Sequence, residues 1–169
     1  FAGNPYFISL DELVKEGVLT AEECKKAKFG RKADDIDYSR LYTERGRLLR
    51  LAYSRSDIGH NAAFTAFCEK NKWWLDDFAL FMAVKGRFEG KPWIEWAEDI
   101  RLRWQNAMDY YRRELYFEVE YYKYLQFKFD QQWRTLKAYA NEKGIRIIGD
   151  IPIYVALDSA DAWANPQMF

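Results

Sequence analysis

Three carboxylates follow a short apolar run near the C-terminal end of the sequence. The run is Ile145–Ile148, and the carboxylates are Asp150, Asp158 and Asp161. In barrels and open parallel sheets, functional side chains gather at the carboxyl ends of the strands. A carboxylate in such a place can hold ligand hydroxyl groups, orient a water molecule or bind a metal ion. It can equally cap a helix or close a turn, as Ser159 and Asp161 can, and spacing alone leaves both interpretations open.

Other groups that could support catalysis are scarce. His60 is the only histidine, and it lies in "DIGHNAAF", a pattern typical of a helix start, so we do not expect a catalytic triad. A zinc site built on several histidines is excluded within this sequence. Cys24 and Cys68 are far apart and lack metal-binding spacing. We therefore expect two reduced thiols in a cytoplasmic protein.

The composition narrows the class of protein. Lys plus Arg and Asp plus Glu number 26 each, so the formal charge is zero, which argues against a dedicated nucleic-acid binder. The longest apolar run falls well short of the roughly 20 residues of a membrane span, and no secretory signal is visible. Aromatic residues make up 18% of the chain. They can stack on sugars or bases, but they are also ordinary core material.

The elements before the carboxylates are predicted to be helical. Ser9 with Glu12, and Thr20 with Glu23, have the spacing of capping boxes, which predicts two short helices. A helix is expected from about residue 38 to residue 55. Two more short helices, separated by a polar corner, are expected in 61–71 and 73–88.

A long helix is predicted from about residue 109 to residue 143. Apolar side chains recur along it at helical spacing, which indicates one buried face; they are Leu115, Val119, Tyr122, Leu125, Phe129, Trp133, Leu136 and Ala140. Gly144 ends the helix, and the β-branched run Ile145–Ile148 is typical of a buried parallel strand. A parallel strand needs neighbours. We therefore expect this chain to be a piece of a larger protein whose other strands are encoded outside it.

The two ends of the chain carry a resemblance to a known family. "FAGNPYFISLDELV" at 1–14 and "GIRIIGDIPIYVALDSADAWANPQMF" at 144–169 closely resemble the amylomaltases, bacterial 4-α-glucanotransferases of the α-amylase clan. "QFKFDQQWRTLKAYANEKG" at 126–144 is similar to the same family, and the helical middle is similar with weaker motifs.

The resemblance implies an α/β fold, a (β/α)₈ barrel interrupted by helical subdomains. Residues 1–8 would form a loop associated with the barrel, and residues 9–115 a helical insertion between the second and third barrel strands. Residues 116–169 would contain the long helix, the third strand, within 145–155, and the active-site loop that follows it.

The resemblance also implies a function, retaining transfer of α-1,4-glucan segments between maltooligosaccharides, with no cofactor and no metal. Asp158 matches the aspartate that helps to shape the donor sugar site. Ser159, Trp163 and Asn4 lie in matching motifs, and Tyr42, or else Tyr38, is the expected secondary-site tyrosine. The nucleophile and the acid/base are expected beyond the last residue, so no catalytic residue is predicted here, and the segment alone is expected to be inactive.

Two other functions remain open from the sequence. The chain could be a helical carbohydrate-binding module whose aromatic residues are platforms for sugars. It could also be a helical regulatory domain that binds a protein partner. Both leave the single predicted strand and its loop unexplained. Nothing in the sequence indicates an oligomeric state.

Overall fold

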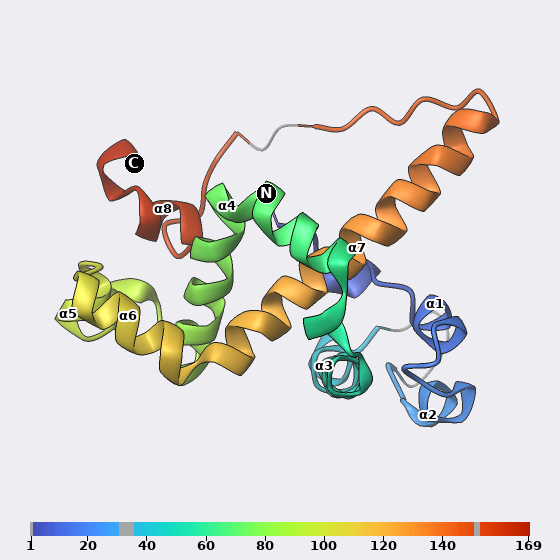
Figure 1. Cartoon of the computed structure of the whole chain (residues 1–169), viewed down its shortest axis with the longest axis horizontal. Helices are drawn as coiled ribbons and strands as arrows, with labels where there is room; N and C mark the ends of the chain where they lie inside the picture. Colours follow the sequence, from blue (N-terminus) through green and yellow to red (C-terminus); the bar gives the residue numbers. More distant parts are fainter. Residues whose placement is uncertain (1, 31–35, 151–152) are drawn as a thin grey trace.

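The computed structural model describes residues 2–30, 36–150 and 153–169, and its elements are all helical (Figure 1). In chain order they are η1 Pro5–Phe7, α1 Leu10–Lys15, α2 Ala21–Lys26, α3 Tyr38–Arg55, η2 Ile58–His60, α4 Ala62–Arg87, η3 Trp93–Glu95, α5 Glu98–Arg101, α6 Gln105–Glu114, α7 Tyr116–Glu142, α8 Ala160–Ala164 and η4 Pro166–Met168.

Two long helices, α4 and α7, pack against each other and form the frame of the molecule (Figure 1). The first core lies where the middle of α7 meets α3, the first half of α4 and the N-terminal segment. The second core lies where the start of α7 meets the second half of α4 with α5, α6 and α8. Tyr122 packs against both cores. The helix α7 therefore connects the two halves of the structure.

The predicted capping box is confirmed at Thr20 and formed by half at Ser9, where the Glu12 side chain pairs with Lys15 instead. Thr20 and Glu23 form a complete capping box at the start of α2, and the Ser9 hydroxyl accepts a hydrogen bond from the backbone N–H of Glu12. α3 has the predicted bounds. Gly144 follows α7 with φ of 74°, the left-handed conformation that glycine adopts at helix ends. Local sequence signals are therefore sufficient to place these helix ends.

The prediction of two short helices in 61–71 and 73–88 is wrong, because α4 runs without a break from Ala62 to Arg87. The expected polar corner is absorbed into the helix. The Asn71 amide donates to the carbonyl of Phe67, 2.8 Å away, and accepts from the indole N–H of Trp74 at 3.2 Å. These bonds one turn apart satisfy the polar side chain within the helix, so it does not interrupt the backbone ladder.

The predicted single helix over 109–143 is also wrong at one point, since it is divided at Leu115 between α6 and α7. The backbone of Leu115 leaves the helical region, with φ of −106° and ψ of 24°. The break lets Ala107 and Met108 of α6 reach the same core as Val119 of α7. Phe129 still packs against the first core, but beyond it the predicted apolar face is exposed at Trp133 and Leu136.

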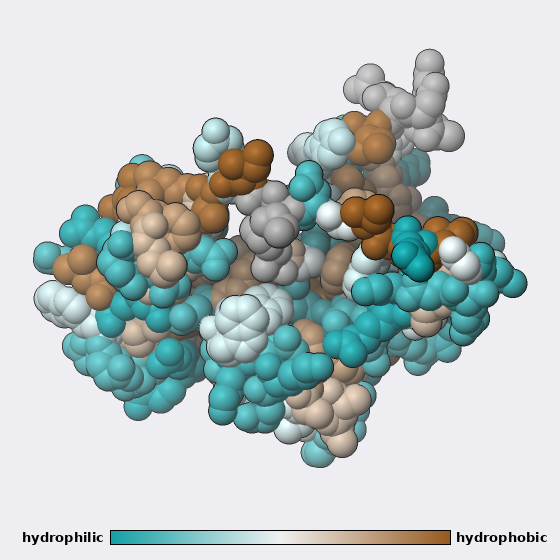
Figure 2. All heavy atoms as spheres, turned by 90° about the horizontal axis from the view of Figure 1, so that it is seen from above, coloured by the Kyte–Doolittle hydropathy of each residue, from teal (hydrophilic) through white to brown (hydrophobic). Residues whose placement is uncertain are grey.

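The strand predicted at Ile145–Ile148 is not supported by this structure, because the described residues contain no strand. The segment is extended and exposed, and Ile148 is 92% accessible to solvent. The segment runs from the end of α7 towards α8 (Figure 1). Figure 2 views the molecule from above and shows apolar side chains exposed on that face. A strand exists only when a neighbour pairs with its backbone, and the described part of the chain supplies none. Residues 151–152 of the predicted strand, residue 1 of the predicted N-terminal loop and residues 31–35 lie outside the description.

Candidate functional site

Asp158 lies in the loop before α8 and is held from two sides by residues far away in the sequence. One carboxylate oxygen accepts a hydrogen bond from the Lys85 ammonium, at the C-terminal end of α4, and the two groups form an ion pair. The other accepts from the backbone N–H of Trp93 in η3, 3.3 Å away. The Asp158 side chain is 37% exposed. A carboxylate offers about four acceptor positions, so positions facing solvent remain for ligand hydroxyl groups.

The residues on either side of Asp158 are also fixed. The indole N–H of Trp93 donates to the carbonyl of Leu157 at 2.6 Å, while Trp93 packs against the second core. The Ser159 hydroxyl accepts from the backbone N–H of Ala162 at 3.2 Å and caps α8. The capping interpretation of Ser159 is therefore confirmed. Contacts at Leu157, Asp158 and Ser159 therefore fix the conformation of the loop together.

Trp163 anchors the same loop in the second core. Its side chain is fully buried, and its indole N–H donates to the carbonyl of Ile100 at 3.1 Å. Its ring lies 5.9 Å from that of Phe81 and 5.7 Å from that of Trp96, between centroids. The guanidinium carbon of Arg103 lies 4.3 Å from its centroid. In this structure Trp163 has no surface available for a ligand, and it connects the Asp158 loop to the helices.

The three carboxylates of the C-terminal segment are not brought together. Asp161 is exposed in the first turn of α8, and Asp150 is exposed before the loop. Within the described residues, no group of three or more acidic, cysteine or histidine side chains has the arrangement of a metal site. His60 lies on the surface, 2.6 Å from Asp57, whose carboxylate raises the pKa of the imidazole. It makes no described contact with the Asp158 loop.

Asn4 lies in the N-terminal segment, apart from the Asp158 loop. Its side chain accepts from the backbone N–H of Tyr6 at 2.9 Å and caps η1, while the residue itself is exposed. The segment is fixed to the first core by a guanidinium, since Arg45 of α3 donates to the carbonyls of Pro5 and Ile8. Burial lowers the pKa of Arg45.

Two glutamines of α7 hold the backbone of this segment in a reciprocal manner. The amide of Gln126 accepts from the N–H of Gly3 at 2.7 Å and donates to its carbonyl at 3.0 Å. Gln132 does the same with Ser9, at 2.6 Å and 3.3 Å. An added Cβ at Gly3 would overlap the ring of Phe129, so only glycine allows this approach. Sequence reasoning missed these glutamines, although Gln126 is a polar residue beside the apolar face of α7.

Tyr42 and Tyr38 project from α3 and are strongly exposed, Tyr42 by 73%. Tyr42 is close enough to Tyr121 of α7 to contribute to its raised pKa of about 12, of which burial is the main cause. Arg50 stacks on Tyr121, 4.4 Å from the centroid, and bonds both carboxylate oxygens of Glu118. Tyr42 therefore belongs to a surface above the first core, whereas Asp158, Ser159 and Trp163 share the loop on the second core.

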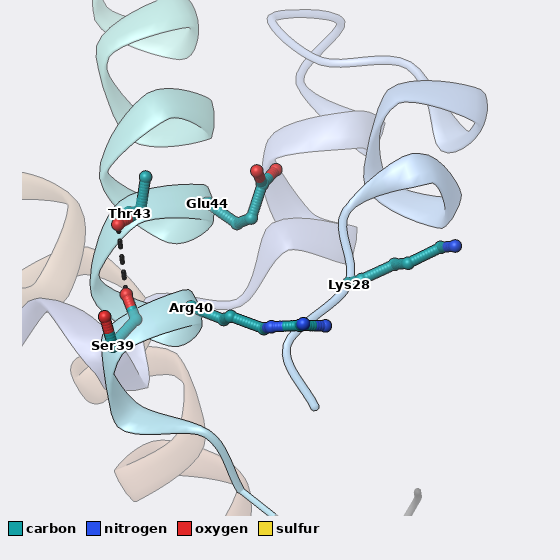
Figure 3. A pocket seen from close by; sticks show the side chains of 5 residues that line it. All are labelled: Lys28, Ser39, Arg40, Thr43 and Glu44. Carbon is teal, nitrogen blue, oxygen red and sulfur yellow. Dashed lines mark hydrogen bonds between the residues drawn. The ribbon is translucent and has the colours of Figure 1, made fainter. Parts of the chain in front are cut away.

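Among the hollows on the surface of the described residues, one lies beside α3 and another beside the end of α7. A polar one of about 270 Å³ is lined by Arg40, Thr43 and Glu44 of α3 with Lys28 opposite; in Figure 3 the Thr43 hydroxyl donates to the Ser39 carbonyl at 3.0 Å. A larger groove of about 970 Å³ lies between the end of α7 and the N-terminal segment. Its apolar lining comes from Phe7, Phe129, Trp133, Leu136 and Tyr139. Neither hollow contains Asp158.

Comparison with known proteins gives consistent matches over the whole chain. A family model described as 4-alpha-glucanotransferase matches residues 1–169. A 4-alpha-glucanotransferase of Clostridium butyricum is 44% identical over 169 residues, which are 100% of this chain and 35% of that protein. One from Thermus thermophilus is 40% identical over 173 residues, 100% of this chain and 34% of that protein.

A solved structure gives the same result. The structure titled "Amylomaltase from Streptococcus agalactiae in complex with acarbose" superimposes with a TM-score of 0.93 at 36% identity. It covers 99% of this chain, which corresponds to 34% of that protein. The chain thus spans about a third of the length of the relatives that it matches. Within the described ranges, none of the helices combines the length and the apolar character that crossing a bilayer requires.

Proposed function

The chain belongs to the 4-alpha-glucanotransferase family, and we propose that the protein containing it transfers α-1,4-glucan segments between maltooligosaccharides. The observation that carries the proposal is the match of the family over all of residues 1–169, including both motif-bearing ends. The relative solved with acarbose supports α-glucans as the substrate class. Transfer would follow the retaining double displacement in which a carboxylate forms a glycosyl intermediate. A sugar hydroxyl rather than water would then take up the glycosyl group.

We assign Asp158 to the binding of a donor sugar within this scheme. Its carboxylate is fixed by Lys85 and by the Trp93 N–H, yet part of it still faces solvent. It would accept hydrogen bonds from sugar hydroxyl groups and hold the ring in position, with no covalent role. Ser159 would shape the same loop through its cap. Trp163 would act from the core as an anchor, without touching the sugar.

Asn4 and Tyr42 would contact glucan elsewhere. Asn4 is exposed at the start of η1, and Tyr42 is exposed on α3, where it would form a secondary site for a longer chain. The nucleophile and the acid/base would come from the part of the protein outside residues 1–169. Residues 1–169 alone would then bind glucan weakly and would not catalyse transfer. A cytoplasmic location stays a prediction.

The barrel would be completed by the same outer part of the protein. Ile145–Ile148 would pair with neighbouring strands there, and the sheet would cover the apolar side chains of Trp133, Leu136 and Tyr139 at the end of α7. This accounts for an apolar helical face that continues for several turns beyond the core of the described residues. We also propose the helical insertion at 9–115 as part of this arrangement.

The test uses the complete protein and maltotriose. The appearance of glucose together with longer maltooligosaccharides would support transfer, whereas glucose and maltose alone would indicate hydrolysis. Unchanged maltotriose would contradict the proposal. The Asp158→Asn variant is expected to lose roughly a hundredfold or more in kcat/KM, because interactions that position substrate are worth that much. Asp109→Asn, at an exposed carboxylate of α6, is the matched control and should keep full activity.

A further inference from the structure

We propose that Lys85 is a positioning residue for the transfer reaction, which it serves by holding the Asp158 carboxylate from the end of α4. This inference rests on the proposed function. It goes beyond that function because it places a residue of the helical region, 73 positions before Asp158, in control of the sugar-binding loop. Trp93 is the second member of this support.

The position of Lys85 is itself well defined. Its side chain is only 24% exposed, and its ammonium lies 5.8 Å from the centroid of Phe81, one turn earlier on α4. Phe81 is buried in the second core. The alkyl chain of Lys85 therefore leaves the core in a fixed direction, and the ammonium meets Asp158 at its end.

The support at Asp158 restrains the carboxylate as well as neutralising it. Lys85 binds one oxygen and the Trp93 N–H binds the other, so rotation of the carboxylate would break at least one hydrogen bond. The indole N–H of Trp93 holds the carbonyl of Leu157 as well, so the backbone before Asp158 cannot turn freely. A preorganised carboxylate loses less freedom when a sugar binds, which is how such positioning accelerates a reaction.

A partly exposed ion pair of this kind contributes little to the free energy of unfolding. A structural role of Lys85 and a positioning role therefore predict different combinations of unfolding midpoint and kcat/KM. If Lys85 only stabilises the fold, its replacement should lower the midpoint of unfolding and leave kcat/KM at low temperature unchanged. If it positions Asp158, its replacement should change kcat/KM while the unfolding midpoint moves little. The two roles are therefore separable by measurement.

The experiment is a double-mutant cycle in the complete protein with maltotriose as substrate. Lys85→Met keeps most of the side-chain volume and removes the charge, and it is expected to lower kcat/KM roughly tenfold or more. In the Asp158→Asn background the same substitution should have less than about a threefold effect, because the group through which Lys85 acts has already been altered. Lys85→Arg should restore most of the activity, since a guanidinium can still pair with the carboxylate.

Lys72→Met is the matched control on the same helix. Lys72 forms an exposed pair with Glu69, and its replacement should leave kcat/KM unchanged. Trp93→Phe removes the indole hydrogen bond to the Leu157 carbonyl and keeps the backbone N–H that binds Asp158. It therefore tests the hold on the loop backbone without changing any charge, and it is expected to lower kcat/KM in the same direction. Lys85→Gln covers the case in which Lys85→Met does not fold, which thermal unfolding followed by circular dichroism would detect.

Two results would overturn the inference. One is wild-type kcat/KM in folded Lys85→Met, or in Lys85→Gln when Lys85→Met is unfolded. The other is an equal loss from Lys85→Met in the wild-type background and in the Asp158→Asn background. If the wild-type protein leaves maltotriose unchanged, the proposed function itself fails, and that outcome is visible before any variant is made.

Discussion

Replacing Trp163 is expected to weaken the anchor of the Asp158 loop more than almost any other single change. Trp163 is fully buried and contacts Phe81, Trp96 and Arg103, so Trp163→Ala would leave a large cavity. Such substitutions cost about 3–5 kcal/mol. The substitution also removes the indole hydrogen bond to the Ile100 carbonyl, which keeps only the backbone N–H of Arg103 at 3.1 Å, at a further cost of about 1 kcal/mol.

This loss is large compared with the usual stability of a domain, about 5–15 kcal/mol. The assay is urea unfolding of the complete protein, followed by circular dichroism at a helical wavelength so that the loss of a tryptophan does not disturb the signal. With a urea dependence of about 2 kcal/mol per molar, a loss of about 4 kcal/mol moves the midpoint of the helical transition down by about 2 M. Trp163→Phe keeps much of the packing and should move it by less than half as much.

Trp73 provides the matched control, because it is a tryptophan of α4 that is 80% exposed. Trp73→Ala should change the free energy of unfolding by no more than about 0.5 kcal/mol. The reasoning would be refuted if Trp163→Ala and Trp73→Ala had equal midpoints. It would also be refuted if Trp163→Ala shifted the midpoint by less than about 0.3 M, since the second core would then not depend on this side chain.

Three further predictions concern stability. Gly3→Ala should destabilise the protein by about 1–3 kcal/mol in thermal unfolding, because the added methyl group overlaps an aromatic ring of α7. Gly46→Ala, in open space on α3, should stabilise it by about 0.5–1 kcal/mol, and equal effects of the two substitutions would contradict the close approach at Gly3. Glu16→Ala removes the carboxylate that lies 2.6 Å from the buried Lys128 ammonium, so it should lower the free energy of unfolding more than Lys128→Met, which leaves no buried charge unpaired. The reverse order of the two losses would contradict the importance of this pairing. Burial raises the pKa of Cys68 from 9.0 to about 11, so between pH 9 and pH 11 the thiol loses its proton in the unfolded state but keeps it in the folded state. The free energy of unfolding of the wild type should therefore fall as the pH rises through this range, and it should fall less steeply in Cys68→Ala. Identical slopes for the two proteins would contradict the raised pKa.

The elements that could be predicted from the sequence are those with local signals. Thr20 and Glu23 mark the start of α2, and Gly144 marks the end of α7, because each interaction involves residues within one turn of the chain. The junction inside α4 was mispredicted for the opposite reason. Its polar residues resemble a corner, but Asn71 finds its partners one turn away inside the helix.

The candidate site was only partly predictable. Asp158, Ser159 and Trp163 are candidates that the resemblance suggests from one continuous motif, and the sequence carries no sign that Trp163 is fully buried. Lys85 and Trp93 could not be found, because they lie 73 and 65 positions away from Asp158 and only the packing of α4 and η3 brings them to it. Contacts over such separations depend on tertiary structure, which hydrophobic periodicity does not encode.

The reciprocal bonds of Gln126 and Gln132 have a consequence for how this protein can be re-engineered. They bring Gly3 and Ser9 beside positions 123 residues later, so the polypeptide departs from and returns to nearly the same point in space. A chain whose two crossing points are adjacent can be shortened between them or receive a different module there without stretching what lies outside. The intervening helices therefore form one unit between two adjacent points of the chain, and an exchange of that unit among relatives would also have to restore its contacts with Asp158 and Trp163.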